Sequence, residues 1–215
     1  MRFSRFSLVS LISFVSISIV PTASAELSFI LNVDRVRDAG GTDYVSTATG
    51  LWIVVADTAQ DGFQPITSGG VNVNDFVSDN DLVIFRGDFT TFFTDGVATS
   101  AATGLNFGNG WDTGDPLAFV WFPTAGTSAT SVTGGEDYGI YTSPVPVDSS
   151  DAWITPADGT LDHTLQMVTT DNLGLFDPGG TVDPSAATAS LQVIPEPSVS
   201  LLALLSGLLV FRRRR

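Results

Sequence analysis

The sequence contains no cysteine, no lysine and only one histidine, His163. Without cysteine, the chain cannot form disulfides, iron–sulfur clusters, thiolate-ligated zinc sites or a thiol nucleophile. Without lysine, it cannot form a Schiff base with a carbonyl substrate. A single histidine also excludes the multi-histidine metal centres of hydrolases within one chain. Much of the common catalytic chemistry is therefore absent.

Positive charge is scarce as well, with nine arginines against 23 acidic residues in a chain of 215. Six of the nine arginines lie near the two ends, at Arg2 and Arg5 and in the last four positions. The segment 26–197 keeps three arginines and all 23 acidic residues. Such a surface repels nucleic acid and anionic lipid, which bind proteins through lysine and arginine. We therefore expect no nucleic-acid partner.

Residues 1–25 have the three parts of a secretory signal peptide. The N-terminal arginines precede a serine-containing apolar stretch over residues 8–20, and the small residues Ala23 and Ala25 stand just before Glu26. We expect signal peptidase to cleave after Ala25, so that the mature chain begins at Glu26 outside the cytoplasmic membrane. A retained membrane anchor is the less favoured alternative, because the apolar stretch is short for a spanning helix.

The C-terminal residues 194–215 combine three unlike features. A Pro-Glu-Pro motif is followed by the apolar run 199–211 and then by four arginines. As a helix, this run would be about 20 Å long, whereas a hydrocarbon core is about 30 Å thick. We predict a short transmembrane helix in the precursor, with the arginines in the cytoplasm and the body outside. The residues are Pro195, Glu196 and Pro197 in the motif and Arg212, Arg213, Arg214 and Arg215 in the tail.

This order of Pro-Glu-Pro motif, apolar helix and arginine cluster resembles the PEP-CTERM sorting signal of bacterial envelope proteins. The resemblance is confined to residues 194–215 together with the N-terminal signal peptide. It implies that an exosortase, a membrane transpeptidase-like enzyme, recognises and processes the chain near Pro195-Glu196-Pro197. It further implies release or transfer to the cell surface or to an exopolysaccharide matrix, with the membrane contacted only through the C-terminal tail. A simple C-terminal membrane anchor is the alternative.

The body between these ends, residues 26–193, has the pattern of strands separated by turns. Apolar and polar residues alternate over 27–33, which predicts a strand with one buried face. Three further runs are apolar on both faces, as in strands at the middle of a packed sheet. We predict one all-β domain, an antiparallel β-sandwich of roughly eight to ten strands that is jelly-roll-like. The runs are 51–55, 82–85 and 117–122, followed by a strand with Leu161, His163, Leu165 and Met167 on one face and a last strand at Leu191 and Val193.

The body offers little to a catalytic mechanism. A Ser-His-Asp triad would need His163, but no Gly-x-Ser-x-Gly motif is present, and Asp162 lies on the opposite face of the predicted strand. We therefore interpret His163 as a partly buried, hydrogen-bonded core residue. A pair of carboxylates, as in glycoside hydrolases, is an alternative because aspartate is abundant. The sequence singles out no such pair.

Two patterns could mark binding sites. Asp75, Asp79 and Asp81 stand in a stretch rich in asparagine, and their oxygen atoms are ligands that calcium prefers. The spacing is not that of an EF-hand loop, so solvated loop residues are the favoured interpretation. Trp111 and Trp153 stand beside acidic residues, where exposed rings could stack on sugars. Core packing is favoured for both of these tryptophans.

Together these observations predict a non-enzymatic secreted protein without a required cofactor. We expect it to be sorted to the cell surface or extracellular matrix and to have a structural or interaction role there. The first alternative is a calcium-assisted carbohydrate-binding module whose partner is an extracellular polysaccharide. The second alternative is a carboxylate-dependent glycosidase. Exposed tryptophans and aspartates on a concave face would favour binding over scaffolding.

Overall fold

The computed structural model describes residues 26–34, 36–38, 45, 50–89, 97–105, 107, 110–143, 151–167 and 190–193. Within these residues the protein contains ten β-strands and no α-helix, so the all-β prediction is confirmed. The predicted signal peptide and the predicted transmembrane helix lie outside the described residues.

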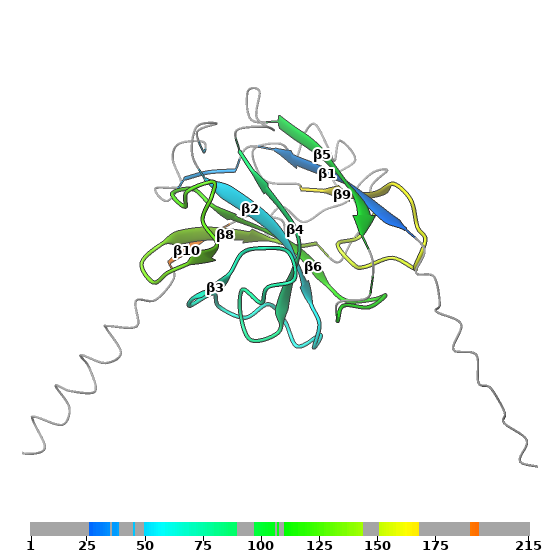
Figure 1. Cartoon of the computed structure of the whole chain (residues 1–215). Helices are drawn as coiled ribbons and strands as arrows, with labels where there is room; N and C mark the ends of the chain where they lie inside the picture. The colour runs from blue at the N-terminus through cyan, green and yellow to red at the C-terminus, as the bar shows by residue number, and fades with distance from the viewer. Residues whose placement is uncertain are drawn as a thin grey trace, which may run out of the picture.

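The strands form three sheets, and Figure 1 labels every strand except β7. The largest, here called the central sheet, is antiparallel and has the order β10-β8-β6-β2-β4. A three-stranded sheet has the order β5-β1-β9, and β3 pairs with β7. The strands are β1 (Leu27–Asp34), β2 (Leu51–Asp57), β3 (Gly69–Gly70), β4 (Asp81–Asp88), β5 (Val97–Leu105), β6 (Leu117–Phe122), β7 (Ser131–Val132), β8 (Asp137–Tyr141), β9 (His163–Gln166) and β10 (Ser190–Val193).

The first core lies between the central sheet and the three-stranded sheet. The alternating apolar residues of β1 are all buried in it, as the period-two pattern predicts. Alternate residues of β2 belong to the same buried cluster. Two sheets that share one core fit the predicted sandwich. The cluster includes Leu27, Phe29, Leu31 and Val33 from β1 with Trp52, Val54 and Ala56 from β2.

The other face of the central sheet is covered by loops. Residues 58–80 and 123–136, here called the loop layer, include the short strands β3 and β7. Figure 1 shows the loop around β3 on the side away from β1, β5 and β9. β2 and β6 are buried along their whole length, as predicted for runs that are apolar on both faces. The second core contains Leu51, Ile53, Val55, Val83 and Val120 from the sheet with Ile66, Val71, Val77, Ala125 and Val132 from the loop layer.

A row of two glycines and two tryptophans crosses the central sheet. Gly87 of β4 pairs with Trp52 of β2, which pairs in turn with Trp121 of β6. Trp121 pairs with Gly139 of β8. Each indole lies over a glycine, since a Cβ added to Gly87 or Gly139 would be 2.2 Å or 2.0 Å from the ring. Each indole Nε1 also donates to a backbone carbonyl, at 3.1 Å and 3.0 Å. We call these four residues the aromatic end of the sheet.

Strand β9 differs from the prediction in two respects. It begins at His163, and Leu161 is 65% exposed instead of facing the core. The reason is local, because Asp162 has a φ of 59°, a left-handed conformation that interrupts the extended chain. β9 also pairs with β1 in parallel, whereas we expected antiparallel pairing throughout. His163, Leu165 and Met167 are buried as predicted.

Candidate functional site

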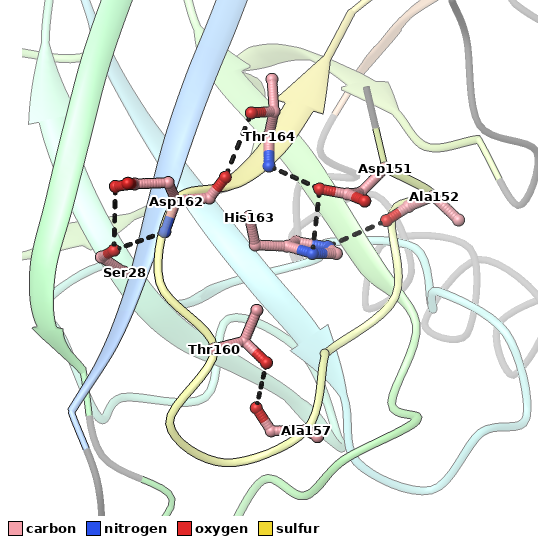
Figure 2. Close-up of polar contacts among 8 residues, drawn as sticks. All are labelled: Ser28, Asp151, Ala152, Ala157, Thr160, Asp162, His163 and Thr164. Atoms are coloured by element: carbon pink, nitrogen blue, oxygen red, sulfur yellow. Dashed lines mark hydrogen bonds and ion pairs between the residues drawn. The ribbon is translucent and has the colours of Figure 1, made fainter. Parts of the chain in front are cut away.

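His163 connects β9 to the segment that begins at Asp151 (Figure 2). Its Nδ1 lies 3.3 Å from Asp151 Oδ2, and its Nε2 lies 3.2 Å from the carbonyl oxygen of Ala152. The ring meets Phe29 edge-on, with centroids 5.6 Å apart. The same oxygen of Asp151 accepts the N–H of Thr164 at 2.8 Å. His163 is therefore a partly buried, hydrogen-bonded residue, as its apolar neighbours in the sequence predict.

The surroundings of His163 do not assemble a Ser-His-Asp relay. Ser28 is bonded to Asp162 instead, because its Oγ accepts the Asp162 N–H at 2.8 Å and lies 3.5 Å from Asp162 Oδ1. Figure 2 shows the imidazole pointing toward Asp151 and Ala152, while Ser28 stands beside Asp162. A relay needs the hydroxyl, imidazole and carboxylate in one hydrogen-bonded line. These contacts instead tie β1, β9 and a loop together.

A second group of polar residues lies where β2 ends and β4 begins. Asp57, which is 0% exposed, and Asp81, which is 2% exposed, are cross-strand partners. Such partners project from the same face of a sheet, with Cβ atoms about 4.5–5.5 Å apart. Alternation places both carboxylates on the face of Val55 and Val83, under the loop layer. We call Asp57, Asp81 and the neighbouring Asn80 the acidic end of the sheet.

Loop N–H groups hold one oxygen of each carboxylate. Asp57 Oδ2 accepts the N–H of Gly62 at 2.8 Å. Asp81 Oδ2 accepts the N–H of Gln64 at 3.0 Å and also the hydroxyl of Ser78. Gly62 has a φ of 95°, which glycine adopts without steric cost. These bonds fold the start of the loop layer over the acidic end.

The second oxygen of each carboxylate has no hydrogen-bond donor among the described residues. The Oδ1 atoms of Asp57, Asp81 and Asn80 are all buried and all lack a partner there. Asn80 Nδ2 donates to Asp61 Oδ1 at 2.9 Å, which sets the orientation of the amide and directs its oxygen away from Asp61. Buried acceptors without a partner are costly, and native proteins rarely leave them unsatisfied. The acidic end therefore holds three buried oxygen acceptors that no described residue satisfies.

Burial raises the pKa of Asp81 above its ordinary value of 3.8, because the ionised carboxylate loses its hydration. The hydrogen bonds from Ser78 and Gln64 act in the opposite direction and lower the pKa. The nearby carboxylates of Asp57 and Asp61 raise it further by repulsion. Negative charge is thus concentrated where folding has removed water.

A hollow of about 300 Å³ opens beside the acidic end. Its lining includes Gln64, whose N–H binds Asp81, and Tyr138, whose hydroxyl accepts the N–H of Ile66 at 3.1 Å. Burial raises the pKa of the Tyr138 phenol above 10.0. The lining residues are Phe63, Gln64, Pro65, Tyr138, Ile140 and Thr142.

The three predicted calcium residues have different surroundings. Asp75 Oδ2 accepts the backbone N–H and the side-chain amide of Asn72 at 3.0 and 3.1 Å, and Asp79 is exposed. Only Asp81 belongs to the acidic end. In the described part of the chain, no three or more His, Cys, Asp or Glu side chains are grouped to hold a metal ion. The sequence analysis missed Asp57, although a carboxylate that closes a long apolar run was an available signal.

The two predicted carbohydrate residues lie in the core. Trp111 is 3% exposed and packs against Phe29 and Phe107, with centroids 6.3 and 4.8 Å apart. Trp153 is 1% exposed, and its Nε1 donates to the carbonyl of Gln166 at 2.9 Å. Core packing, the favoured interpretation of both tryptophans, is therefore confirmed, and the alternative that they are exposed is wrong. Burying a large aromatic ring is favourable even beside acidic residues in the sequence. Neither ring has an exposed face on which a sugar could stack.

Most of the predicted processing residues lie outside the described part of the chain. Glu26 is described, and it is exposed directly before β1. At the other end, β10 finishes at Val193, immediately before the predicted sorting signal. The residues outside the described part are Ala23 and Ala25, Pro195, Glu196 and Pro197, and Arg212, Arg213, Arg214 and Arg215.

Comparison of this chain with family models, curated proteins and solved structures gives no match. Across the described residues, no helix is both long enough and apolar enough to cross a membrane. What the residues can do is therefore derived from their own chemistry and placement.

Proposed function

We propose that this is an exported PEP-CTERM protein that an exosortase sorts to the cell surface or to an exopolysaccharide matrix. There it has a non-enzymatic, structural or interaction role. The observation that carries the proposal is the order of Pro195-Glu196-Pro197, the apolar run 199–211 and the terminal arginines. The signal peptide over 1–25 supports it, because a sorted chain must first cross the cytoplasmic membrane.

The placement of the last strand agrees with removal of the tail. β10 pairs with β8 at one edge of the central sheet and ends at Val193. Cleavage near Pro195 would leave every described strand intact. We propose that the body is a jelly-roll-like sandwich and that the tail forms a short transmembrane helix in the precursor.

The alternatives are less well supported by the described residues. A carbohydrate-binding module would need exposed rings, and Trp111 and Trp153 are buried. A glycosidase would need two carboxylates that flank a sugar. Asp57 and Asp81 are two neighbouring carboxylates, but both are buried beneath the loop layer, where a polysaccharide cannot contact them. The scaffold or interaction role remains the better-supported proposal.

The test is the intact mass of the protein recovered from outside the cells. We expect a mass that lacks both the signal peptide and the arginine tail. In a strain without exosortase, the tail should remain and the chain should stay in the membrane fraction. Alanine at both Pro195 and Pro197 should have the same effect, whereas Ser198→Ala, beside the motif, serves as the matched control. External protein that still carries Arg212 to Arg215 would refute the proposal.

A further inference from the structure

The acidic end brings two carboxylates together where water has little access. Asp57 and Asp81 each accept a backbone N–H through Oδ2, and each keeps a buried Oδ1 without a donor among the described residues. Two carboxylates buried side by side without compensation are costly. A cation held between the two carboxylates would offset this cost, because it offers positive charge to both Oδ1 atoms.

No arginine serves this purpose in the part of the chain that the structure describes, where the arginines are Arg37 and Arg86. Arg86 donates to Asn72 Oδ1 at 2.9 Å and to the carbonyl of Thr127 at 2.7 Å. Arg86 also lies five residues after Asp81 on β4, and in an extended strand this spacing separates the two residues by roughly 16 Å. Arg37 lies beside the aromatic end, where its carbonyl accepts an indole N–H. Neither of these two side chains is shown to neutralise Asp57 and Asp81, so the described residues leave room for a bound cation.

We infer that Asp57, Asp81 and Asn80 bind one calcium ion through their Oδ1 atoms. All three are among the buried side-chain oxygens that have no hydrogen-bond partner in the described part of the chain. Calcium takes about six to eight oxygen ligands in a flexible geometry, and carboxylate, amide, backbone carbonyl and water oxygens all serve. Magnesium requires a near-ideal octahedron and gives up its water reluctantly. Two carboxylates and one amide, set between a strand end and a loop, fit calcium better.

This donor set is smaller than a cluster of three or more acidic side chains, which the described residues do not form. It is distinguished by burial, because Asp57 and Asp81 are almost completely enclosed. It also differs from the set that the sequence predicts, since it replaces Asp75 and Asp79 with Asp57 and Asn80. The pairing of β2 with β4 brings Asp57 and Asp81 together, and Asn80 directly precedes Asp81 in the chain.

The ion fastens the loop layer to the central sheet. The N–H groups of Gly62 and Gln64 already bind the other oxygens of the same carboxylates. The backbone carbonyl of Asn80 accepts two hydrogen bonds from Thr58, one from its hydroxyl at 2.8 Å and one from its backbone N–H at 3.2 Å. Loss of the ion therefore loosens the start of the loop layer, which covers the second core. This role does not depend on how the tail is processed.

Calorimetric titration of the purified full chain with calcium chloride tests the site directly. The chain is kept in mild detergent because of its apolar tail, and the ionic strength is held at about 0.15 M to screen general attraction to the acidic surface. We expect one calcium ion per chain, with a dissociation constant of about 10⁻³ M or tighter. Asp57→Asn and Asp81→Asn should each weaken binding at least about tenfold. Asp79→Asn, an exposed carboxylate in the same loop, should leave it unchanged.

Thermal unfolding provides a second readout that does not depend on measuring binding. Without calcium, Asp57→Asn should be at least as stable as the natural chain, because it removes a buried repulsion and its amide oxygen can still accept the Gly62 N–H. With calcium, the midpoint should rise for the natural chain and for Asp79→Asn, but not for Asp57→Asn or Asp81→Asn. Magnesium at equal concentration should produce a smaller rise.

Two results would overturn the inference. One is the absence of stoichiometric binding to the natural chain at calcium concentrations up to about 10 mM, well above the affinities of extracellular calcium modules. The other is binding that survives in Asp57→Asn and Asp81→Asn, or that disappears in Asp79→Asn, since the ion would then lie elsewhere. If Asp57→Asn does not fold, the natural chain and Asp81→Asn decide by the same criteria.

Discussion

The aromatic end and the acidic end of the central sheet share the strands β2 and β4, but their buried side chains are satisfied to different degrees. At the aromatic end, each indole covers a glycine and donates its N–H to a carbonyl. At the acidic end, Asp57 and Asp81 each keep one oxygen without a donor among the described residues. The polar groups of the two indoles at the first end are satisfied by the protein itself, whereas for the second end we propose a bound ion.

The free-energy cost of burial depends on how many polar groups and charges a side chain carries. An indole has one donor to satisfy and otherwise gains by leaving water. A carboxylate has two oxygens and a charge, so burial without full compensation is costly. Changes at the aromatic end should therefore cost packing energy under all conditions. Changes at the acidic end should depend on calcium.

The largest expected effect is at the aromatic end. Trp121→Ala should lower the free energy of unfolding by about 3–5 kcal/mol, because a fully buried indole leaves a cavity. Urea unfolding with and without calcium measures this loss, which should be the same in both buffers. Phe76→Ala, at a side chain that is 49% exposed, is the control and should change stability by less than about 0.5 kcal/mol. If the stability lost in Trp121→Ala depended on calcium, the two ends would be energetically coupled, contrary to this prediction.

The next effect tests the close approach of ring and glycine. Gly139→Ala should cost about 1–3 kcal/mol, because its methyl group would lie 2.0 Å from the Trp121 ring. Gly126→Ala is the matched control, since nothing lies within 4 Å of the added carbon there. Adding Trp121→Phe should recover part of the cost, and a double-mutant cycle from denaturant unfolding measures that coupling. Costs that simply add would show that the ring is not the cause.

A smaller effect is expected beneath the loop layer, at Tyr138. Near neutral pH, Tyr138→Phe should cost about 1 kcal/mol, because the Ile66 N–H loses its acceptor. The raised pKa of Tyr138 means that the folded state holds the phenol proton more tightly than the unfolded state. That contribution is complete below pH 10.0 and is lost as the pH rises through the folded pKa. The stability difference between the two proteins should therefore shrink in alkali, as unfolding curves across this range would show; a constant difference would argue against the buried phenol.

The smallest effect is expected at Leu161, outside both ends. Leu161→Ala should change the free energy of unfolding by no more than about 0.5 kcal/mol, because the side chain is 65% exposed. Leu165→Ala, at a fully buried position of β9, should cost about 2–5 kcal/mol in the same urea titration. Equal losses would mean that β9 begins before His163, as the alternation alone predicts.

Local pattern was sufficient for most of the fold. The alternation over 27–33 and the apolar run 51–55 correctly indicated one strand with a single buried face and one buried on both faces. The pattern failed at Leu161, because the left-handed backbone conformation of Asp162 interrupts the extended chain there. Alternation of apolar residues carries no information on backbone angles. It also could not reveal that β9 runs parallel to β1, since that pairing joins segments far apart in the chain.

The candidate site was only partly accessible from the sequence. Asp81 stands in a stretch rich in asparagine and aspartate, which indicated a possible cation site. Asp57 lies far from this stretch in the sequence and comes close to Asp81 only through the pairing of β2 with β4. Core packing was correctly favoured for Trp111 and Trp153, but exposure stayed open as an alternative because acidic neighbours do not determine which way a ring points. Burial and cross-strand contact are tertiary properties, and they decide which oxygens remain without a donor.

Hydrogen exchange followed by NMR, with and without calcium, compares the two ends most directly. Under strongly native conditions, local opening governs the exchange of individual N–H groups. Calcium should slow exchange at the amides of Gly62 and Gln64, which bind the carboxylates of the acidic end, and leave the indole N–H groups of Trp52 and Trp121 unchanged. Exchange at Gly62 and Gln64 that is indifferent to calcium would contradict the account.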